Sequence, residues 1–299
     1  MSLVHGEHLP PALHALLRGP VPQRALDWCA AAVGGRVNAV RPLAGGTSSA
    51  VHAVDAAGRA LVLRRFVRAD WLAEEPDAPA REARALELAA GGTVPAPALV
   101  AVDPAGEAAG EPALLMTRLP GATVWSPPAR APFLDGLAAV ARAVWATPMP
   151  AGPAPVPDYA PYAPAASRAP AWSRRPVVWA RAVEAFATAR PADDRRVLVH
   201  RDLHPGNVLW ADEAVTGLVD WPNASVGSPA ADVGHCRMNL AWTLGPEAAD
   251  RFTAACGIGD VHPWWDLAAA LGGFSDADLD GLPRAHEPFV AAALDRLGA

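Results

Sequence analysis

The sequence predicts an α+β protein of two lobes, in which an antiparallel sheet with a helix precedes a mainly helical C-terminal lobe. Three observations support this prediction. Short apolar runs with glycine turns fill residues 37–68, a helical pattern follows at 79–90, and helical patterns dominate after residue 131. A length of 299 residues allows about two domains. We expect an N-terminal lobe over residues 1–118 and a C-terminal lobe over residues 119–299.

The first lobe is predicted from turn residues that separate apolar runs, as in an antiparallel meander. Good helix formers then fill residues 79–90, with a proline near the start and a glycine pair after the end. The later run ALLMTRL is a candidate for a buried strand. The apolar runs lie at residues 37–40 with Leu43, 51–54 and 61–67, and the turns lie at residues 45–46 and 57–58.

The second lobe is predicted from helical spacing of apolar residues, which is clearest at residues 131–146. Proline and alanine then dominate residues 147–170, which contain Tyr159 and Tyr162. We interpret this segment as an extended surface loop or linker, and the alternative is a flap over a substrate site. Further helices are expected at residues 176–189, 245–256, 264–271 and 286–297.

The basic residues restrict the chemistry, because all 25 of them are arginine and the chain has no lysine. This excludes a Schiff-base enzyme and a Walker A nucleotide site, which both need a lysine amine. Arginine can still bind phosphate through its fixed set of donors. The net charge of −6 argues against a nucleic-acid partner.

Cysteine usage and hydropathy indicate the compartment. The three cysteines are widely spaced, so we expect neither a disulfide framework nor a zinc site. We expect the compartment to be a reducing cytoplasm. The N-terminal residues lack the pattern of a signal peptide. We expect no membrane span and no membrane partner, because prolines interrupt the longest charge-poor stretch.

The segment from residue 198 to residue 235 carries the candidate chemistry. The short apolar runs NVLW and GLVDW are separated by the polar turn ADEAVT, which predicts an antiparallel hairpin. The start of the first strand then lies beside the end of the second, which brings Asn207 and Asp220 together. Amide and carboxylate oxygens suit Mg²⁺ that also contacts a substrate phosphate. Asp202, on the preceding loop, can face the same centre from the acceptor side.

Three features of this segment are the motif HRDLHPGN, the later aspartate in DW and the run GSPAADVGH. Together they resemble the protein-kinase superfamily, in the form of its aminoglycoside phosphotransferase and choline kinase branch. The resemblance implies a protein-kinase-like two-lobe fold. It implies Asp202 as the catalytic base or orienting group, and Asn207 and Asp220 as Mg²⁺ ligands. It also implies that Asp232 anchors the loop backbone, and that His200 and His204 pack beneath the loop. Arg201 departs from the glycine common in this branch, and we expect it to lie at the surface.

The same resemblance extends through the first lobe. It implies a nucleotide-binding hairpin loop, whose alternative is an ordinary turn. Arg64 stands where kinases place a phosphate-binding lysine, and Glu82 would pair with it, although the alternative is an exposed ion pair. Met116 would lie behind the adenine, and Thr117 O and Leu119 N would bind its edge. The candidate loop residues are Gly45, Gly46, Thr47, Ser48 and Ser49.

The acceptor site is the least determined part. Asp266 with Trp264 and Trp265 is either a wall that binds a cationic or sugar acceptor, or part of a helix with core tryptophans. Further acidic candidates are Asp276, Asp278, Asp280 and Glu287, and the three aspartates are expected in a solvated loop and helix start.

The predicted function is transfer of the γ-phosphoryl group of MgATP to a hydroxyl of a small molecule. GTP remains open as the donor, and antibiotic, amino alcohol and sugar acceptors all remain open. The alternatives are a catalytically inactive kinase-like nucleotide-binding protein and a binding protein for a cationic ligand. Either a monomer or a homodimer is compatible with the sequence.

Overall fold

The structure is a computed structural model that describes residues 9–162, 169, 173–193, 195–272 and 283–298. Two compact units make up the chain. The first contains residues 1–90 and 96–119, and the second contains residues 91–95 and 120–299. None of the helices described has the length and apolar character needed to cross a membrane.

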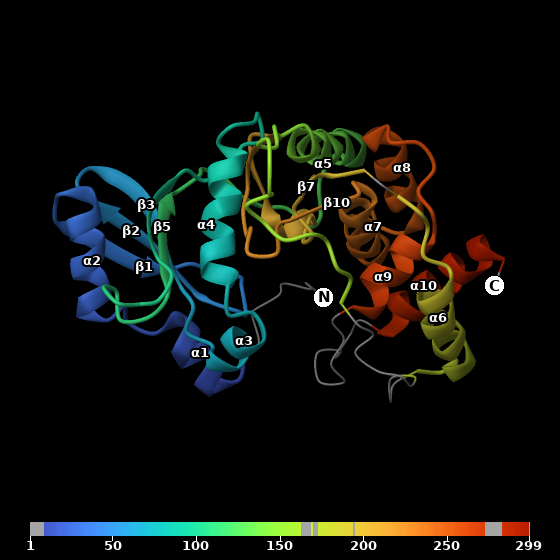
Figure 1. The fold of residues 1–299 in the computed structure, drawn as a ribbon, viewed down its shortest axis with the longest axis horizontal. Coiled ribbons are helices and arrows are strands. Elements are labelled where there is room, and N and C mark those ends of the chain that lie inside the picture. The colour runs from blue at the N-terminus through green and yellow to red at the C-terminus, as the bar shows by residue number, and fades with distance from the viewer. Residues whose placement is uncertain (1–8, 163–168, 170–172, 194, 273–282, 299) are drawn as a thin grey trace. The chain divides into compact units, whose positions relative to one another are not determined.

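The first unit is built on a five-stranded antiparallel sheet with the order β1-β2-β3-β5-β4 (Figure 1). Helix α2 packs against β1, β2 and β4, and helix α4 packs against β4 and β5. The elements of this unit are α1 (Pro11–Arg18), α2 (Gln23–Val33), β1 (Val37–Pro42), β2 (Ala50–Ala56), β3 (Arg59–Arg65), α3 (Ala69–Glu74), α4 (Ala78–Ala89), β4 (Leu99–Asp103) and β5 (Ala113–Thr117).

The predicted meander is confirmed as β1, β2 and β3, and the predicted helix as α4. Apolar residues of α2, β2, β3 and β5 form one buried core, which includes Cys29, Leu61 and Leu115. Burial of this apolar surface is the main force that holds α2 on the sheet. Helix α2 ends at Val33 and is capped by Gly34, whose φ of 64° is the left-handed conformation that glycine adopts without strain.

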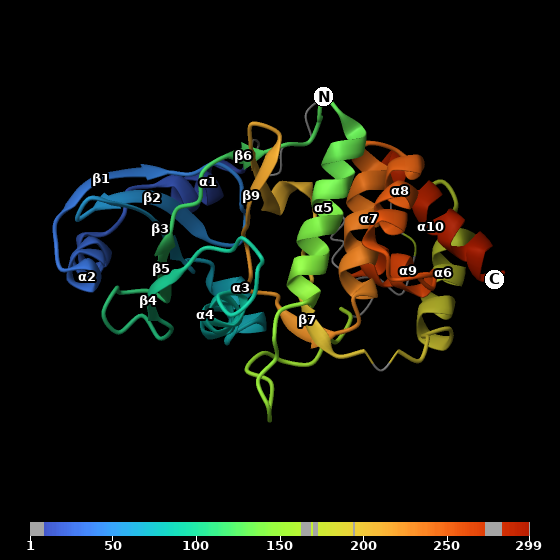
Figure 2. The same ribbon diagram turned by 90° about the horizontal axis from the view of Figure 1, so that it is seen from above.

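The second unit is mainly helical. Helix α7 packs against α8 and α9, and α5 lies beside α8 (Figure 2). Apolar residues of α6, α7, α9 and α10 share a second buried core. Its elements are β6 (Ala122–Thr123), α5 (Arg130–Trp145), α6 (Pro176–Thr188), β7 (Val197–Val199), the 3₁₀ helix η1 (Pro205–Asn207), β8 (Val208–Ala211), β9 (Ala214–Leu218), β10 (Ser225–Gly227), α7 (Ala230–Thr243), α8 (Pro246–Cys256), α9 (Trp264–Leu271) and α10 (Pro283–Leu297).

The predicted hairpin is confirmed as the antiparallel pair β8 and β9, with Val208 opposite Leu218. Its turn is shorter than expected, because β9 already begins at Ala214. The turn residues Asp212 and Glu213 have φ values of 49° and 63°. Two consecutive left-handed residues form the tight turn whose twist matches that of paired strands. The prediction that the whole of ADEAVT forms the turn is therefore wrong, because the turn is shorter.

The described part of the proline- and alanine-rich segment is fixed to the second unit by backbone hydrogen bonds. The N–H of Tyr159 donates to Val226 O of β10 at 2.8 Å, and the N–H of Val226 donates to Pro157 O at 2.8 Å. Asp158 also pairs with Val226 as a parallel bridge. Residues 157–159 are therefore a docked segment.

Helix α7 was not predicted, and its burial explains why. Asp232, Arg237 and Asn239 are buried together with the apolar residues of this helix. Polar side chains on buried faces remove the separation of polar and apolar residues on which helix prediction depends.

Candidate functional site

The loop after β7 is held in place by Asp232 in the first turn of α7. Its Oδ1 accepts a hydrogen bond from the backbone N–H of Arg201 at 2.6 Å, and its Oδ2 accepts one from the N–H of His200 at 3.1 Å. Trp145 Nε1 also donates to Oδ2, at 2.9 Å. The expectation that Asp232 anchors the loop backbone is confirmed by these contacts.

His200 lies beneath this loop and is fully buried. Its Nε2 lies 3.1 Å from the carbonyl oxygen of Val219, and its ring meets that of Trp221 edge-on at 4.7 Å between centroids. Burial lowers the pKa of His200. The contacts confirm that His200 packs in the interior, but the backbone carbonyl that its side chain meets belongs to Val219 and not to the loop.

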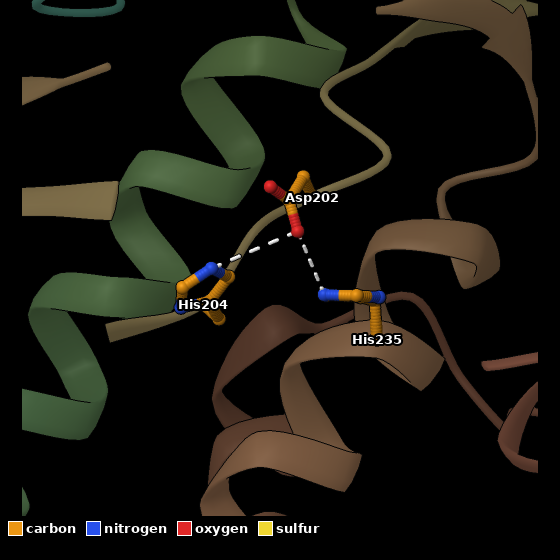
Figure 3. A group of neighbouring side chains, drawn as sticks. All are labelled: Asp202, His204 and His235. Carbon is orange, nitrogen blue, oxygen red and sulfur yellow. Dashed lines mark ion pairs between the residues drawn. The ribbon is translucent and has the colours of Figure 1, made fainter. Parts of the chain in front are cut away.

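Asp202 is the centre of a group of polar side chains (Figure 3). Its Oδ1 lies 3.0 Å from His235 Nε2 and 3.6 Å from His204 Nε2, and its Oδ2 accepts a hydrogen bond from Asn207 Nδ2 at 3.1 Å. Burial raises the pKa of Asp202, but the electrostatic influence of His204 and the hydrogen bond from His235 lower it by a larger amount, so the net pKa lies below its usual range. The carboxylate is therefore ionised at neutral pH.

The ligand atoms of Asp202, His204 and His235 lie within 4.8 Å of one another, which is a spacing compatible with a metal ion. The backbone of the loop argues against that use. The N–H of Gly206 donates to His204 Nδ1 at 3.0 Å, so this nitrogen is unprotonated and the proton of the neutral ring is on Nε2. A protonated Nε2 has no lone pair to offer a metal ion, and at 3.6 Å from Asp202 Oδ1 it makes no good hydrogen bond either.

Asn207 and Asp220 lie at the same end of the β8–β9 hairpin. The N–H of Val219 donates to Asn207 O at 2.9 Å, which places the residue before Asp220 beside Asn207. Asn207 Nδ2 donates to the backbone oxygen of Asp202 at 2.9 Å as well as to its side chain, so the amide nitrogen is turned towards the loop. Asp220 has a φ of 72°, a conformation that asparagine and aspartate tolerate better than most residues.

A small pocket of about 70 Å³ lies beside Asp202 in the second unit. Its lining includes Asp202, His235, Arg201, Tyr159 of the docked segment and the nearby Tyr162. The Arg201 guanidinium lies over Tyr162 at 4.1 Å and over Tyr159 at 5.4 Å, which is a cation–π arrangement. The docked segment is thus part of the wall of the pocket, and Arg201 takes part in that wall as well.

Arg64 of β3 and Glu82 of α4 form a buried ion pair in the first unit. Arg64 Nη1 donates to Glu82 Oε1 at 2.9 Å, and the side chains are 6% and 1% exposed. The alternative of a solvent-exposed pair is therefore wrong. Arg64 Nη2 also lies 3.5 Å from Ser48 Oγ, so the structure brings Arg64 and the predicted loop together.

The loop of residues 45–49 follows β1 and turns at two glycines, with φ values of 82° at Gly45 and 63° at Gly46. Arginine side chains hold its carbonyl oxygens from both sides. Arg18 binds the carbonyl oxygens of Gly45 and Gly46, the second at 2.9 Å, and Arg68 Nη1 donates to Thr47 O at 3.2 Å. Ser49 is buried.

The remaining nucleotide candidates lie on and after β5. Met116 is buried, and it pairs with Val62 of β3. The N–H of Thr117 donates to Ala98 O at 2.9 Å, and Leu119 is the last residue of the first unit. The assignment of these residues to an adenine site remains a prediction.

The candidate acceptor wall on α9 is part of the core. Asp266 is 2% exposed, and it accepts hydrogen bonds from Arg237 Nε at 2.9 Å and from Arg296 Nη1 at 2.7 Å. Trp264 and Trp265 are buried. The interpretation as a helix with core tryptophans is confirmed, and the cation-binding wall is wrong because two arginines already occupy its carboxylate.

Glu287 is also internal. Its Oε2 accepts hydrogen bonds from Ser173 Oγ at 2.5 Å and from Trp179 Nε1 at 3.1 Å. The other acidic candidates, Asp276, Asp278 and Asp280, lie outside the described residues.

Sequence reasoning did not single out His235 or Arg18. His235 follows Asp232 by three positions and so shares its face of α7, a relation that becomes visible only once the helix is recognised. Arg18 lies far from the loop in sequence, and no local pattern connects the two.

Comparisons with known proteins concern the family and the fold of the chain. A model of the "Phosphotransferase enzyme family" matches residues 39–270, and no curated protein matches the chain. The structure of aminoglycoside phosphotransferase APH(4)-Ia with ADP and hygromycin B is 19% identical, with a TM-score of 0.59 over 91% of this chain and 96% of that one. Spectinomycin phosphotransferase APH(9)-Ia with ADP and spectinomycin is 14% identical, with a TM-score of 0.56 over 94% and 90%. The similarity to these structures shows a shared fold.

Proposed function

Because the chain belongs to the phosphotransferase enzyme family, we propose that it transfers the γ-phosphoryl group of ATP to a hydroxyl group of a small molecule. The observation that carries the proposal is the position of Asp202. Its carboxylate lines a pocket, is held on both oxygens by side-chain donors, and stands on the same loop as Asn207.

The donors present fit a magnesium ion. Asn207 offers an amide oxygen, since its nitrogen is bonded to Asp202, and Asp220 offers a carboxylate from the same end of the hairpin. These are the hard oxygen ligands that Mg²⁺ takes beside substrate phosphates. When bound, Mg²⁺ neutralises charge on the phosphates.

The residues of this chain then have separate tasks. Asp202 receives the acceptor hydroxyl in the pocket and orients it, because a loose phosphoryl transition state needs positioning more than a strong base. Arg64, held by Glu82 and close to Ser48, would bind the phosphates of the nucleotide.

The acceptor is a hydroxylated compound that places one group beside Asp202. Related structures hold hygromycin B and spectinomycin, which supports an antibiotic as one class. Amino alcohols and sugars remain in the proposal. Arg201 adds positive charge to the pocket, and Asp202 is the one carboxylate among its described lining residues. Neutral and anionic hydroxyl compounds therefore belong in any panel beside the aminoglycosides.

Thermal melting tests the nucleotide part of this proposal. A ligand at about a hundred times its Kd stabilises the folded state by about 2.7 kcal/mol. We expect ATP with Mg²⁺ to raise the Tm well above the value with ATP and a chelator. In Asp220→Asn, which tolerates the left-handed backbone, the additional rise from Mg²⁺ should be lost.

Asp260→Ala is the control, because Asp260 is an exposed aspartate outside the site. It should keep the full effect of Mg²⁺ on the Tm. Equal melting with and without MgATP would exclude a nucleotide site. A shift without phosphoryl transfer to any acceptor would favour the alternative of an inactive nucleotide-binding protein.

A further inference from the structure

Helix α7 contributes two polar side chains to the loop that carries Asp202. Asp232 binds the backbone of the two residues before Asp202, and His235 contacts the side chain of Asp202 itself. Residues three apart share one face of a helix, so both contacts come from the same face of α7. One rigid element therefore fixes the loop and the direction of its carboxylate.

The two oxygens of Asp202 have different holders. His235 Nε2 lies 3.0 Å from Oδ1, which is the distance of a hydrogen bond from an imidazole N–H to a carboxylate. Asn207 Nδ2 donates to Oδ2 at 3.1 Å. Because these donors approach from α7 and from the 3₁₀ helix η1, together they fix the rotation of the carboxylate about its last bond.

His204 does not replace His235 in this arrangement. Its Nε2 lies 3.6 Å from Oδ1, beyond a good hydrogen bond. Its ring orientation is set elsewhere, because Nδ1 accepts a hydrogen bond from Gly206 N–H and the ring stacks on Trp125 at 5.6 Å between centroids. The short contact to Oδ1 is therefore that of His235.

His235 also reaches the place where the acceptor would bind. It lines the same pocket as Asp202 and Arg201, and a quarter of its side chain is exposed. A hydrogen bond to Oδ1 uses one lone pair of that oxygen and leaves a second one for an acceptor hydroxyl.

We propose that His235 is a positioning residue for phosphoryl transfer, which donates from Nε2 to Asp202 Oδ1 and thereby aims Asp202 at the acceptor hydroxyl. The inference rests on the proposed function. In the step it serves, a bond forms between the hydroxyl oxygen and the γ-phosphorus. The bond from that phosphorus to the bridging oxygen breaks, its electron pair leaves with ADP, and the hydroxyl proton passes to Asp202.

The test compares His235→Leu with His235→Gln, whose side-chain amide can still donate to Asp202. The control is His14→Gln, because His14 is an exposed histidine on α1. ADP formation from MgATP is measured with hygromycin B, choline, glucose and lactate as acceptors, and the rate with water alone is the background. Because misplacement of a reacting group by about 1 Å can cost about 100-fold, we expect kcat of the leucine variant to fall roughly 10- to 100-fold. KM for MgATP should be unchanged, and the glutamine variant should recover most of the loss.

A second measurement does not depend on turnover. In protein labelled with ¹⁵N-histidine, the Nε2 resonance of His235 is assigned by its absence in His235→Gln. This nitrogen should carry a proton, and its resonance should shift in Asp202→Ala. The resonances of His14 should not shift in that variant.

The outcomes separate the two claims. If the wild type forms no ADP with any of the four acceptors, the proposed function is overturned and the role of His235 falls with it. If the wild type is active and the leucine variant equals it, only the inference is overturned. If the Nε2 resonance of His235 does not shift in Asp202→Ala, the contact itself is overturned.

Discussion

Asp202→Ala is expected to reduce phosphoryl transfer by at least about 10²- to 10⁴-fold, the range typical of a group that handles the proton of the reacting hydroxyl. The variant removes the carboxylate that lines the pocket and that His235 and Asn207 hold. Binding of MgATP should change little, because Asp202 serves the acceptor. The measurement is kcat for ADP formation, together with the rise in Tm that MgATP produces.

Asp260→Ala is again the matched control, and it should retain the wild-type kcat. If Asp202→Ala turned over at the wild-type rate, Asp202 would lose the role assigned to it. If the variant instead lost the thermal shift with MgATP, Asp202 would belong to nucleotide binding.

Arg64→Ala is expected to weaken nucleotide binding and to destabilise the first unit. A hydrogen bond to a charged group contributes about 1.5–3 kcal/mol, so KM for MgATP should rise roughly 10- to 100-fold. Glu82 would also lose its ion pair with Arg64 while only 1% exposed. Removal of one member of a buried ion pair costs about 3–5 kcal/mol, because the other charge stays buried. Steady-state kinetics and urea denaturation measure the two effects.

Two further variants isolate the causes. Arg64→Ala combined with Glu82→Gln removes both charges, so part of the stability should return while KM stays high. Arg251→Ala breaks an ion pair whose side chains are 51% and 57% exposed, and it should cost under about 1 kcal/mol. An unchanged KM in Arg64→Ala would remove Arg64 from the phosphate site, and a stability loss no larger than that of Arg251→Ala would contradict the buried pair.

Arg64 is of interest because the chain has no lysine, and Arg64 stands where kinases place a phosphate-binding lysine. With 25 arginines and no lysine, every permanently charged cationic side chain in this chain is a guanidinium. At Arg64 one nitrogen is bonded to Glu82 and another lies near Ser48. A planar guanidinium can donate to both partners at once in a fixed geometry, whereas a lysine ammonium is a single point charge on a flexible chain.

The sequence predicted the fold where local signals were strong. The meander of β1 to β3, helix α4 and the β8–β9 hairpin all follow from apolar runs, glycine turns and helix formers. Helix α7 was missed because it buries Asp232, Arg237 and Asn239, and the partners of Asp232 and Arg237 come from distant parts of the chain. Periodicity cannot reveal a helix that buries polar groups on internal partners.

The candidate site was predictable along one loop and unpredictable across the fold. Asp202, Asn207 and Asp220 lie close in sequence, so the hairpin alone relates them. His235 reaches Asp202 from α7, and Tyr159 reaches Arg201 from a segment without periodicity. For Asp266 the sequence left two interpretations open, because its exposure could not be judged before Arg237 and Arg296 were seen to bind it.

The central claim is that this chain phosphorylates a small-molecule hydroxyl with MgATP at Asp202. The most direct measurement is ³¹P NMR of MgATP incubated with a panel of hydroxylated antibiotics, amino alcohols, sugars and hydroxy acids, with wild type and Asp202→Ala in parallel. The account predicts ADP and a new phosphate-ester resonance with at least one acceptor, in the wild type alone. ADP-free spectra with every acceptor, or an ester that forms equally in Asp202→Ala, would contradict it.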